Sequence, residues 1–482
     1  MIFKGRTVFV FVLLTMFATS LLTVTLVNTP IFANQGERMA SSMAAEGLTK
    51  QEFEKINTTL KLIESRFYSD VDRTKVIDGA INGMMSSLQD PYSVYMDKEV
   101  ADEFSSSSIE GAFTGIGAEV TLEDGKVTVV SPIKGSPAER AGIMAKDVLI
   151  SVNGEKLEGL KLNDAVAKIR GPKGTKAKIL VKRAGVAEPI EYVVVREEID
   201  LETVYAQMLP DKIGLIEISQ FSMKTAKRFG EELKNLESQG MKGLVIDVRN
   251  NPGGVVPVLI EIAEHFVPKG KVILQMENRE GKREQQLSKG SSKPYPVTVL
   301  INKGSASAAE ILAVALQENH VGTLVGETSF GKGTVQVSYT EELRDGSLLK
   351  MTIAKWLTPD GNWIHHQGVK PDIEIKPPDY YYAVRLSKER DLAYDMNNDD
   401  VKNAQVMLDA LGMKPGRKDG YFSQQTKSAV EKFQRQNGLH ATGVINSETA
   451  EKLEDAVRKL LEDPKSDVQL NKAVEVLRKE IR

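Results

Sequence analysis

Apolar and polar residues follow a regular pattern between Pro296 and Val337, and this pattern predicts two buried strands with a helix between them. The first apolar run, Val297 to Ile301, is short and rich in β-branched residues, which is typical of a buried strand. After a polar turn, apolar residues recur at helical spacing: Ile311, Leu312, Ala315 and Leu316. A second run, Val321 to Val325, predicts another strand, so Ser307 falls at a strand-to-helix corner.

Ser307 is the candidate nucleophile of this stretch. Free backbone N–H groups and the positive end of the helix dipole gather at such a corner, so an oxyanion that develops there meets donors. No G-x-S-x-G motif surrounds the serine, and no recognisable triad pattern includes the five histidines: His265, His320, His365, His366 and His440. Lys332 is the better candidate base, because burial among glycines and apolar strands lowers the pKa of an amine. Gln336 would share a strand face with Lys332 and orient it.

Ser307, Lys332 and the block FGKGTVQ, which ends at Gln336, resemble the carboxyl-terminal processing (tail-specific) proteases. The resemblance implies a Ser-Lys dyad supported by Gln336, on a crotonase-like ββα core. It also implies an oxyanion hole made of backbone N–H groups. Gly253 or Gly254 would supply one donor, because glycine lets the backbone approach a substrate carbonyl, and Ala308 would supply the other.

Ordinary structural roles remain open for the same residues. Ser305 and Ser307 could be helix N-caps, and Lys332 could be a turn lysine. The spacing from Gly326 to Lys332 also imitates a phosphate-binding loop, but Gly333 stands where that loop needs Ser or Thr. The adjacent pair His365 and His366 is interpreted as non-catalytic, because neighbouring residues on a strand point to opposite faces.

Composition excludes several other classes of function. The chain has 482 residues, enough for two to four domains, and a formal net charge of -3, which implies no general affinity for nucleic acid. It contains no cysteine, so thiol chemistry, disulfides and Cys-ligated metals are excluded. We expect no cofactor and no metal.

The N-terminus predicts a membrane anchor or signal segment over residues 1–34. Lys4 and Arg6 precede an uncharged run from Thr7 to Val27 that is long enough to span a bilayer as a helix. Cleavage after Ala33 is disfavoured by Ile31, so an uncleaved anchor is preferred. The expected location is the cell membrane, single-pass, with an extracytoplasmic catalytic domain; a cleaved segment would give a secreted protein.

Residues 48–105 form a predicted N-terminal helical region. Its apolar residues recur at helical spacing: Phe53, Ile56, Leu60 and Ile63. The family resemblance implies that this region mediates a homodimer, and a packed cap on the core is the alternative.

Residues 108–198 resemble an inserted PDZ domain, with short strands at regular intervals and the blocks SPAERAGI and DVLISVNG. The loop Gly115, Ile116, Gly117 and Ala118 matches the family's carboxylate-binding loop, whose N–H groups turn towards a peptide C-terminus. Arg170 follows the predicted domain helix. The resemblance implies that it couples the PDZ domain to the protease, and a solvated charge at a helix end is the alternative.

Residues 200–378 are the predicted protease core, and residues 398–456 resemble a small all-α peptidoglycan-binding domain. The predicted core of this domain consists of Leu408, Leu411, Ala429, Val430 and Phe433. Ser423 replaces a glycine often found there, so glycan binding is left open. Residues 466–482 predict a charged C-terminal helix.

The sequence therefore predicts an α/β multidomain serine endopeptidase that recognises protein C-termini. The resemblance implies envelope or signalling proteins as substrates, with regulated proteolysis such as sporulation signalling as one pathway. An inactive scaffold that binds C-termini or the cell wall is the alternative; it would require the loss of Ser307 or Lys332, and both are present.

Overall fold

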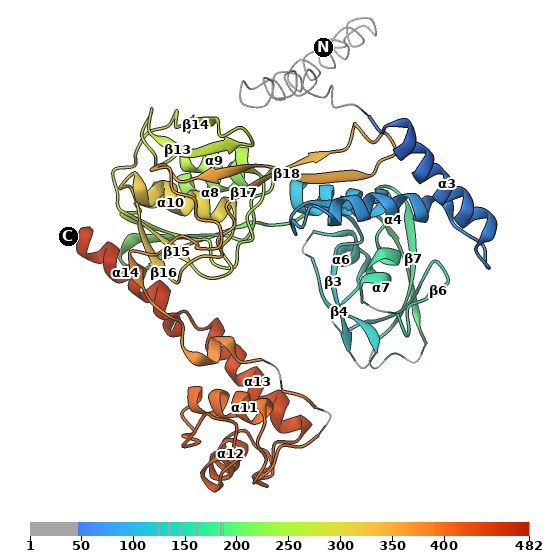
Figure 1. Ribbon diagram of the computed structural model, residues 1–482. Helices are drawn as coiled ribbons and strands as arrows, with labels where there is room; N and C mark the ends of the chain where they lie inside the picture. Colours follow the sequence, from blue (N-terminus) through green and yellow to red (C-terminus); the bar gives the residue numbers. More distant parts are fainter. Residues whose placement is uncertain are drawn as a thin grey trace, which may run out of the picture. The chain divides into compact units, whose positions relative to one another are not determined.

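The computed structural model describes residues 47–481 apart from a few loop positions, namely Asp124, Lys134, Ala145, Lys161, Ala184, Gly185, Ala187, Arg385 and Glu389. The chain divides into two compact units, Met1–Ser87 and Leu88–Arg482. Figure 1 shows the elements of both units.

No helix among the described residues is long and apolar enough to cross a membrane. This finding contradicts the predicted localisation, a single-pass membrane protein with its catalytic domain outside the cytoplasm, so that prediction is wrong as it stands. The residues predicted to form the anchor, Thr7 to Val27, lie outside the part of the chain that the structure describes.

Among its described residues, the first unit contains the helices α3 (Lys50–Arg66) and α4 (Arg73–Ser86), as the apolar spacing predicts. Thr49 and Glu52 form a capping box that starts α3. Of the apolar residues on α3, only Leu60 is buried, whereas Phe53 is 57% and Ile56 is 48% exposed. Much of the apolar surface of this helix is therefore left open to water.

A six-stranded sheet organises the second unit, in the order β10-β11-β12-β15-β16-β19. Its strands are β10 (Val204–Leu209), β11 (Ile213–Ile218), β12 (Gly243–Asp247), β15 (Val297–Ile301), β16 (Thr323–Gly326) and β19 (Ile373–Glu374). All neighbours pair in parallel except β10 and β11. Parallel strands are covered on both faces, which explains the nearly continuous apolar runs of β12 and β15.

Helices cover the two faces of this sheet (Figure 1). On one face pack α8 (Thr225–Ser238), α9 (Val256–Ala263) and α10 (Ala308–Glu318). On the other face packs the C-terminal helix α14 (Val468–Glu480), through Leu470, Ala473, Val474 and Leu477. In β15, Val299 faces the first layer and Leu300 faces α14, as the alternation of strand side chains requires.

A second, five-stranded sheet lies in the same unit. It contains β1 (Val94–Met96), β13 (Val272–Asn278), β14 (Arg283–Leu287), β17 (Thr334–Tyr339) and β18 (Leu348–Leu357). β17 and β18 pair antiparallel, and β1 also pairs antiparallel with β18, at Leu348, Leu349 and Lys350. This sheet positions the segment that carries Lys332 and Gln336.

The predicted PDZ domain has its own antiparallel sheet and its own core. The sheet consists of β3 (Ala118–Glu123), β4 (Lys126–Pro132), β5 (Val148–Val152), β7 (Lys176–Lys182) and β8 (Ile190–Val195), with β6 (Glu155–Lys156) beside β5. Two helices belong to it, α6 (Pro137–Ala141) and α7 (Leu162–Ile169). A separate pair, β2 (Ala112–Gly115) and β9 (Glu197–Asp200), flanks the domain, and the helix α5 (Lys98–Phe104) precedes it.

A small helical module lies between β19 and α14 in the sequence. It consists of α11 (Asp399–Ala410), α12 (Gln424–Gln436) and α13 (Ser447–Glu462). Four of its predicted core residues are buried, namely Leu408, Ala429, Val430 and Phe433, and Leu411 packs against them half-buried. The predicted three-helix core is therefore confirmed.

Candidate active site

Ser307 is the N-cap residue of α10. It lies on the segment that leads from the carboxyl end of β15 into this helix. Its backbone has φ 55° and ψ -115°. A positive φ is uncommon for a residue with a side chain, and such strain clusters at functional sites. Ser305 differs, because it is fully buried and its hydroxyl donates to the carbonyl of Val248 at 2.8 Å. The geometry supports Ser307 rather than Ser305 as the nucleophile.

The turn after β12 lies directly against Ser307. Gly253 has φ 101°, and a Cβ at this position would lie 2.8 Å from the Cβ of Ser307. Only glycine permits an approach this close. The N–H of Ala306 donates to the carbonyl of Asn251 at 2.9 Å, which fixes the turn beside the serine.

The predicted oxyanion donors differ in their surroundings. The N–H of Gly253 already donates to the side-chain oxygen of Asn251 at 2.8 Å. Ala308 is the first residue of α10, so its N–H is one of the donors that the helix leaves unpaired. Gly254 is exposed and has φ 145°. The N–H of Gly253 is therefore engaged within the turn, whereas that of Ala308 has no partner within its helix.

Glu310 links the nucleophile to the lysine segment, and the sequence reasoning missed it. Its side chain is fully buried in the first turn of α10. The carboxylate accepts from the N–H of Ser307 at 2.8 Å and from the N–H of Lys332 at 2.9 Å. It also accepts from the N–H of Gly331 at 2.6 Å and from the hydroxyl of Ser329 at 2.5 Å. The pattern Ser-x-x-Glu before an apolar run is a capping signal that could have drawn attention to it.

Lys332 lies half-buried between two glycines, as predicted. Burial lowers the pKa of Lys332 to about 8, and the nearby charge of Lys350 acts in the same direction, while Asp90 and Glu310 oppose the shift. At pH 7 an amine with this pKa is neutral in about one molecule in ten, against fewer than one in a thousand for an ordinary lysine, and only the neutral amine can act as a general base. The Nζ atom lies 4.8 Å from the centre of the Tyr92 ring.

Gln336 sits on β17, and its side-chain amide donates to the hydroxyls of Thr334 at 2.9 Å and Thr352 at 3.0 Å. No hydrogen bond joins the side chains of Ser307, Lys332 and Gln336, all three of which the structure describes. The structure places the three predicted residues on neighbouring segments, and the amine of Lys332 points at the ring of Tyr92. Catalytic hydrogen bonds commonly tighten only when substrate is bound.

The two adjacent histidines lie in a loop after β18, which corrects the prediction that they occupy opposite faces of a strand. Their ring centres are 3.9 Å apart. His365 accepts from the N–H of Gly333 at 3.2 Å, and the N–H of His366 donates to the carbonyl of Gly331 at 2.8 Å. They brace the glycines around Lys332. Within the described ranges, no group of three or more acidic or histidine side chains could hold a metal ion.

The predicted carboxylate-binding loop connects β2 to β3. The carbonyls of Ile116 and Gly117 accept bonds from Ala138 and Ile133, at 2.7 and 2.9 Å, so both are engaged within the domain. Gly117 has φ 76° and packs against Ser136 too closely for a Cβ. β3 is an edge strand of its sheet, and α7 contacts it. An edge strand beside a helix is the arrangement that accepts an added peptide strand.

Arg170 comes directly after α7 and contacts two elements outside the PDZ sheet. Its guanidinium forms an ion pair with Glu103 of α5 at 2.5 Å and lies 5.1 Å from the centre of the Phe113 ring. Glu103 is followed by Phe104, and Nζ of Lys350 lies 4.7 Å from the centre of the Phe104 ring. Arg170 is therefore paired and partly covered, although its partner Glu103 is largely exposed.

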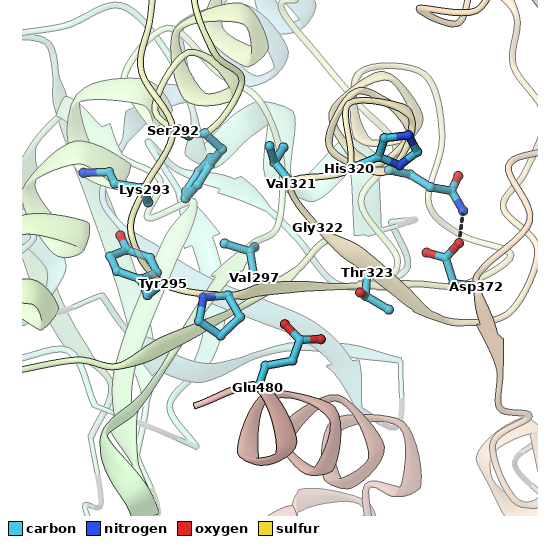
Figure 2. A pocket seen from close by; sticks show the side chains of 13 residues that line it. Ser292, Lys293, Tyr295, Val297, His320, Val321, Gly322, Thr323, Asp372 and Glu480 are labelled. Atoms are coloured by element: carbon cyan, nitrogen blue, oxygen red, sulfur yellow. Dashed lines mark hydrogen bonds between the residues drawn. The ribbon is translucent and has the colours of Figure 1, made fainter. Parts of the chain in front are cut away.

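A cavity of about 520 Å³ opens elsewhere on the core (Figure 2). Val297 and Thr323, which begin β15 and β16, line it together with His320, Asp372 and Glu480. None of the predicted site residues lines it. Ser307 follows the carboxyl end of β15, where α/β sheets bind their ligands, so this cavity is not the candidate active site.

Family models match four parts of the chain. The model for peptidase family S41 matches residues 212–375, and the model for the activating protease CtpB N-terminal domain matches residues 16–100. A PDZ domain model matches residues 128–183, and a peptidoglycan binding domain model matches residues 397–453.

Curated relatives are similar over almost the whole chain. The carboxy-terminal processing protease CtpB of Bacillus subtilis is 47% identical over 92% of this chain and 92% of that protein. Carboxy-terminal processing protease CtpA of the same organism is 44% identical over 89% and 91%. A solved structure, the photosystem II D1 C-terminal processing protease, is 27% identical with a TM-score of 0.41, over 66% of this chain and 86% of that one. The chain belongs to the peptidase S41 family of carboxy-terminal processing proteases, which are serine-type peptidases.

Proposed function

We propose that Ser307 is the nucleophile and Lys332 the general base of a protease that takes hold of protein C-termini. The observation that carries the proposal is the link through Glu310. One buried carboxylate binds the backbone of Ser307 and of Lys332 at the same time, so the two segments are held in fixed register. The nucleophile lies at a helix N-terminus, and the base has a lowered pKa.

Peptide cleavage then follows from this chain's own groups. Neutral Lys332 removes the proton from the Ser307 hydroxyl, and the oxygen attacks the scissile carbonyl. The N–H groups of Ala308 and Gly254 donate to the oxyanion. As the intermediate collapses, the Lys332 ammonium returns the proton to the departing amine. Water, activated by the same amine, then releases the acyl group from Ser307.

The described arrangement must change before attack, because Nζ of Lys332 lies over the Tyr92 ring. We propose that a peptide at the PDZ loop favours the aligned arrangement. The contacts of Arg170 with Glu103, and of Phe104 with Lys350, lead from the PDZ domain towards the lysine segment. A ligand shifts such an equilibrium only through its different affinity for the two states. The PDZ loop is then both a docking site and a switch.

Finer features are part of the same proposal. They include the crotonase-like core, the domain boundaries given above, peptidoglycan binding by residues 398–456, and a homodimer, which the exposed Phe53 and Ile56 of α3 support. Regulated proteolysis such as sporulation signalling is retained as the proposed pathway. A comparison of protein C-termini between cells with the parent protein and cells with Ser307→Ala would reveal the substrates. Identical C-termini in the two kinds of cells would argue against the proposed pathway.

Substitution of the proposed dyad should abolish cleavage. Ser307→Ala and Lys332→Ala should each reduce the casein cleavage rate by about 10⁴-fold or more, because nucleophile and base act as a unit. Gln336→Ala should have a smaller effect. Ser305→Ala is the matched control; the loss of its buried hydrogen bond should cost ~1 kcal/mol of stability while cleavage persists. Normal turnover by Lys332→Ala would refute the assignment of the base.

The cleavage rate should rise with pH. The pKa of Lys332 is about 8, and only the neutral amine accepts the proton, so the rate falls as pH drops below this value. At pH values below the pKa, kcat/KM should increase about tenfold per pH unit and level off above it. Single-turnover rates on a short peptide, with folding followed by circular dichroism, provide the measurement. A flat profile across this range in folded protein would exclude Lys332 as the base.

Peptides with free apolar C-termini should stimulate cleavage of an unrelated reporter, and amidated versions should not, since they lack the carboxylate. Arg170→Ala should reduce this stimulation more than it reduces peptide binding. Arg140→Ala, which removes an exposed ion pair on the same domain, should change neither. If the free peptides instead slow the reporter in proportion to their concentration, the PDZ domain only tethers substrate.

A further inference from the structure

We propose that Asp467, the N-cap residue of the C-terminal helix α14, is a positioning residue for the glycine turn beside Ser307. The inference rests on the proposed function of Ser307 and extends it to the end of the chain. It gives the C-terminal helix a part in forming the active site. The sequence predicts a charged terminal helix here.

Arg249 joins the two regions. It follows β12 and begins the turn that leads to Gly253 and Gly254, and its side chain is only 16% exposed. Asp247 accepts from Nε of Arg249 at 3.0 Å and from Nη2 at 2.6 Å. On its outer edge the same guanidinium donates to both carboxylate oxygens of Asp467, at 3.0 and 2.6 Å. The guanidinium is thus held between two carboxylates.

Asp467 also caps the helix α14 while it binds Arg249. Its Oδ1 atom accepts from the N–H groups of Gln469 and Leu470 at 3.1 and 2.9 Å, so it caps α14. The Gln469 side chain accepts from Arg249 at 3.0 Å and donates to the carbonyl of Ile375 at 2.7 Å. Behind this cap, the apolar face of α14 packs on the sheet face formed by β11, β12, β15 and β16. The cap is therefore anchored firmly enough to hold Arg249.

The turn receives one more contact from the C-terminal part of the chain. Asn250 has φ 56°, and its side chain donates to the hydroxyl of Tyr381 at 3.1 Å. Asn302, on the turn after β15, accepts from the N–H of Asn250 at 2.8 Å. Asp467 and Tyr381 thus contact two consecutive turn residues, Arg249 and Asn250. Residues from the C-terminal part of the chain therefore help to fix the turn that packs on Ser307.

Loss of the Asp467 charge should therefore act on catalysis through geometry. The guanidinium of Arg249 would keep one carboxylate partner and lose the bidentate pair that fixes its outer edge. Small misplacements of groups around a reacting atom lower kcat strongly, even when the altered residue touches no substrate. Binding of the substrate chain depends on other surfaces, so KM should change little.

The test compares two variants of the full-length chain. Asp467→Asn removes the charge but keeps a good N-cap, because asparagine caps helices as well as aspartate does. Arg478→Ala is the matched control; it removes an exposed ion pair with Asp211 near the other end of the same helix. Measurements are kcat and KM on a peptide reporter, the affinity for a peptide aldehyde that mimics the tetrahedral intermediate, and the melting temperature.

For Asp467→Asn we expect kcat and aldehyde affinity to fall together by about tenfold or more, with KM within about twofold of the parent. Asp467→Glu keeps the charge and should recover part of kcat. Arg478→Ala should behave as the parent. An unchanged kcat in Asp467→Asn, or equal losses of kcat and melting temperature in both helix variants, would overturn the inference. Residual cleavage by Ser307→Ala would instead overturn the proposed function, which keeps the two failures distinct.

Discussion

The buried carboxylate of Glu310 is the interaction on which the candidate site depends. A carboxylate without water is costly unless its oxygens are satisfied, and here four donors satisfy it. Two of these donors belong to Ser307, which follows β15 of the first sheet, and to Lys332, which lies between β16 of that sheet and β17 of the second. Because the burial cost is recovered only when all four donors are in place, the carboxylate favours a single register between the helix N-terminus and the lysine loop.

Other parts of the second unit contact the segments of Ser307 and Lys332 and help to hold them in place. The glycine turn after β12 packs against Ser307, and Arg249 connects that turn to the cap of α14. On the other side, His365 and His366 brace the glycines around Lys332. Arg170 of the PDZ domain pairs with Glu103 of α5, and the next residue, Phe104, contacts Lys350 of the second sheet. Segments far apart in sequence are thus held around Ser307, the proposed nucleophile.

Local patterns predicted much of this arrangement. The change from strand to helical spacing placed Ser307 at a corner, and glycines on both sides of Lys332 indicated a buried base. Contacts between distant residues could not be predicted, since nothing in the neighbourhood of Arg249 indicates a partner 218 residues later. The spacing of Phe53 and Ile56 predicted a helix correctly, but periodicity alone does not say whether an apolar face is covered within the chain. The histidine pair was misplaced because a loop was taken for a strand.

The most direct test of this account is the cleavage rate of Glu310→Gln, a change that nearly preserves shape. A neutral amide presents one acceptor oxygen and two donor hydrogens where the site offers only donors, so the contacts of one carboxylate oxygen, either those to Ser307 and Lys332 or those to Ser329 and Gly331, must break. The account predicts a fall in kcat of about 100-fold or more, with peptide binding at the PDZ loop unchanged. Cleavage at the parental rate by folded Glu310→Gln would contradict it.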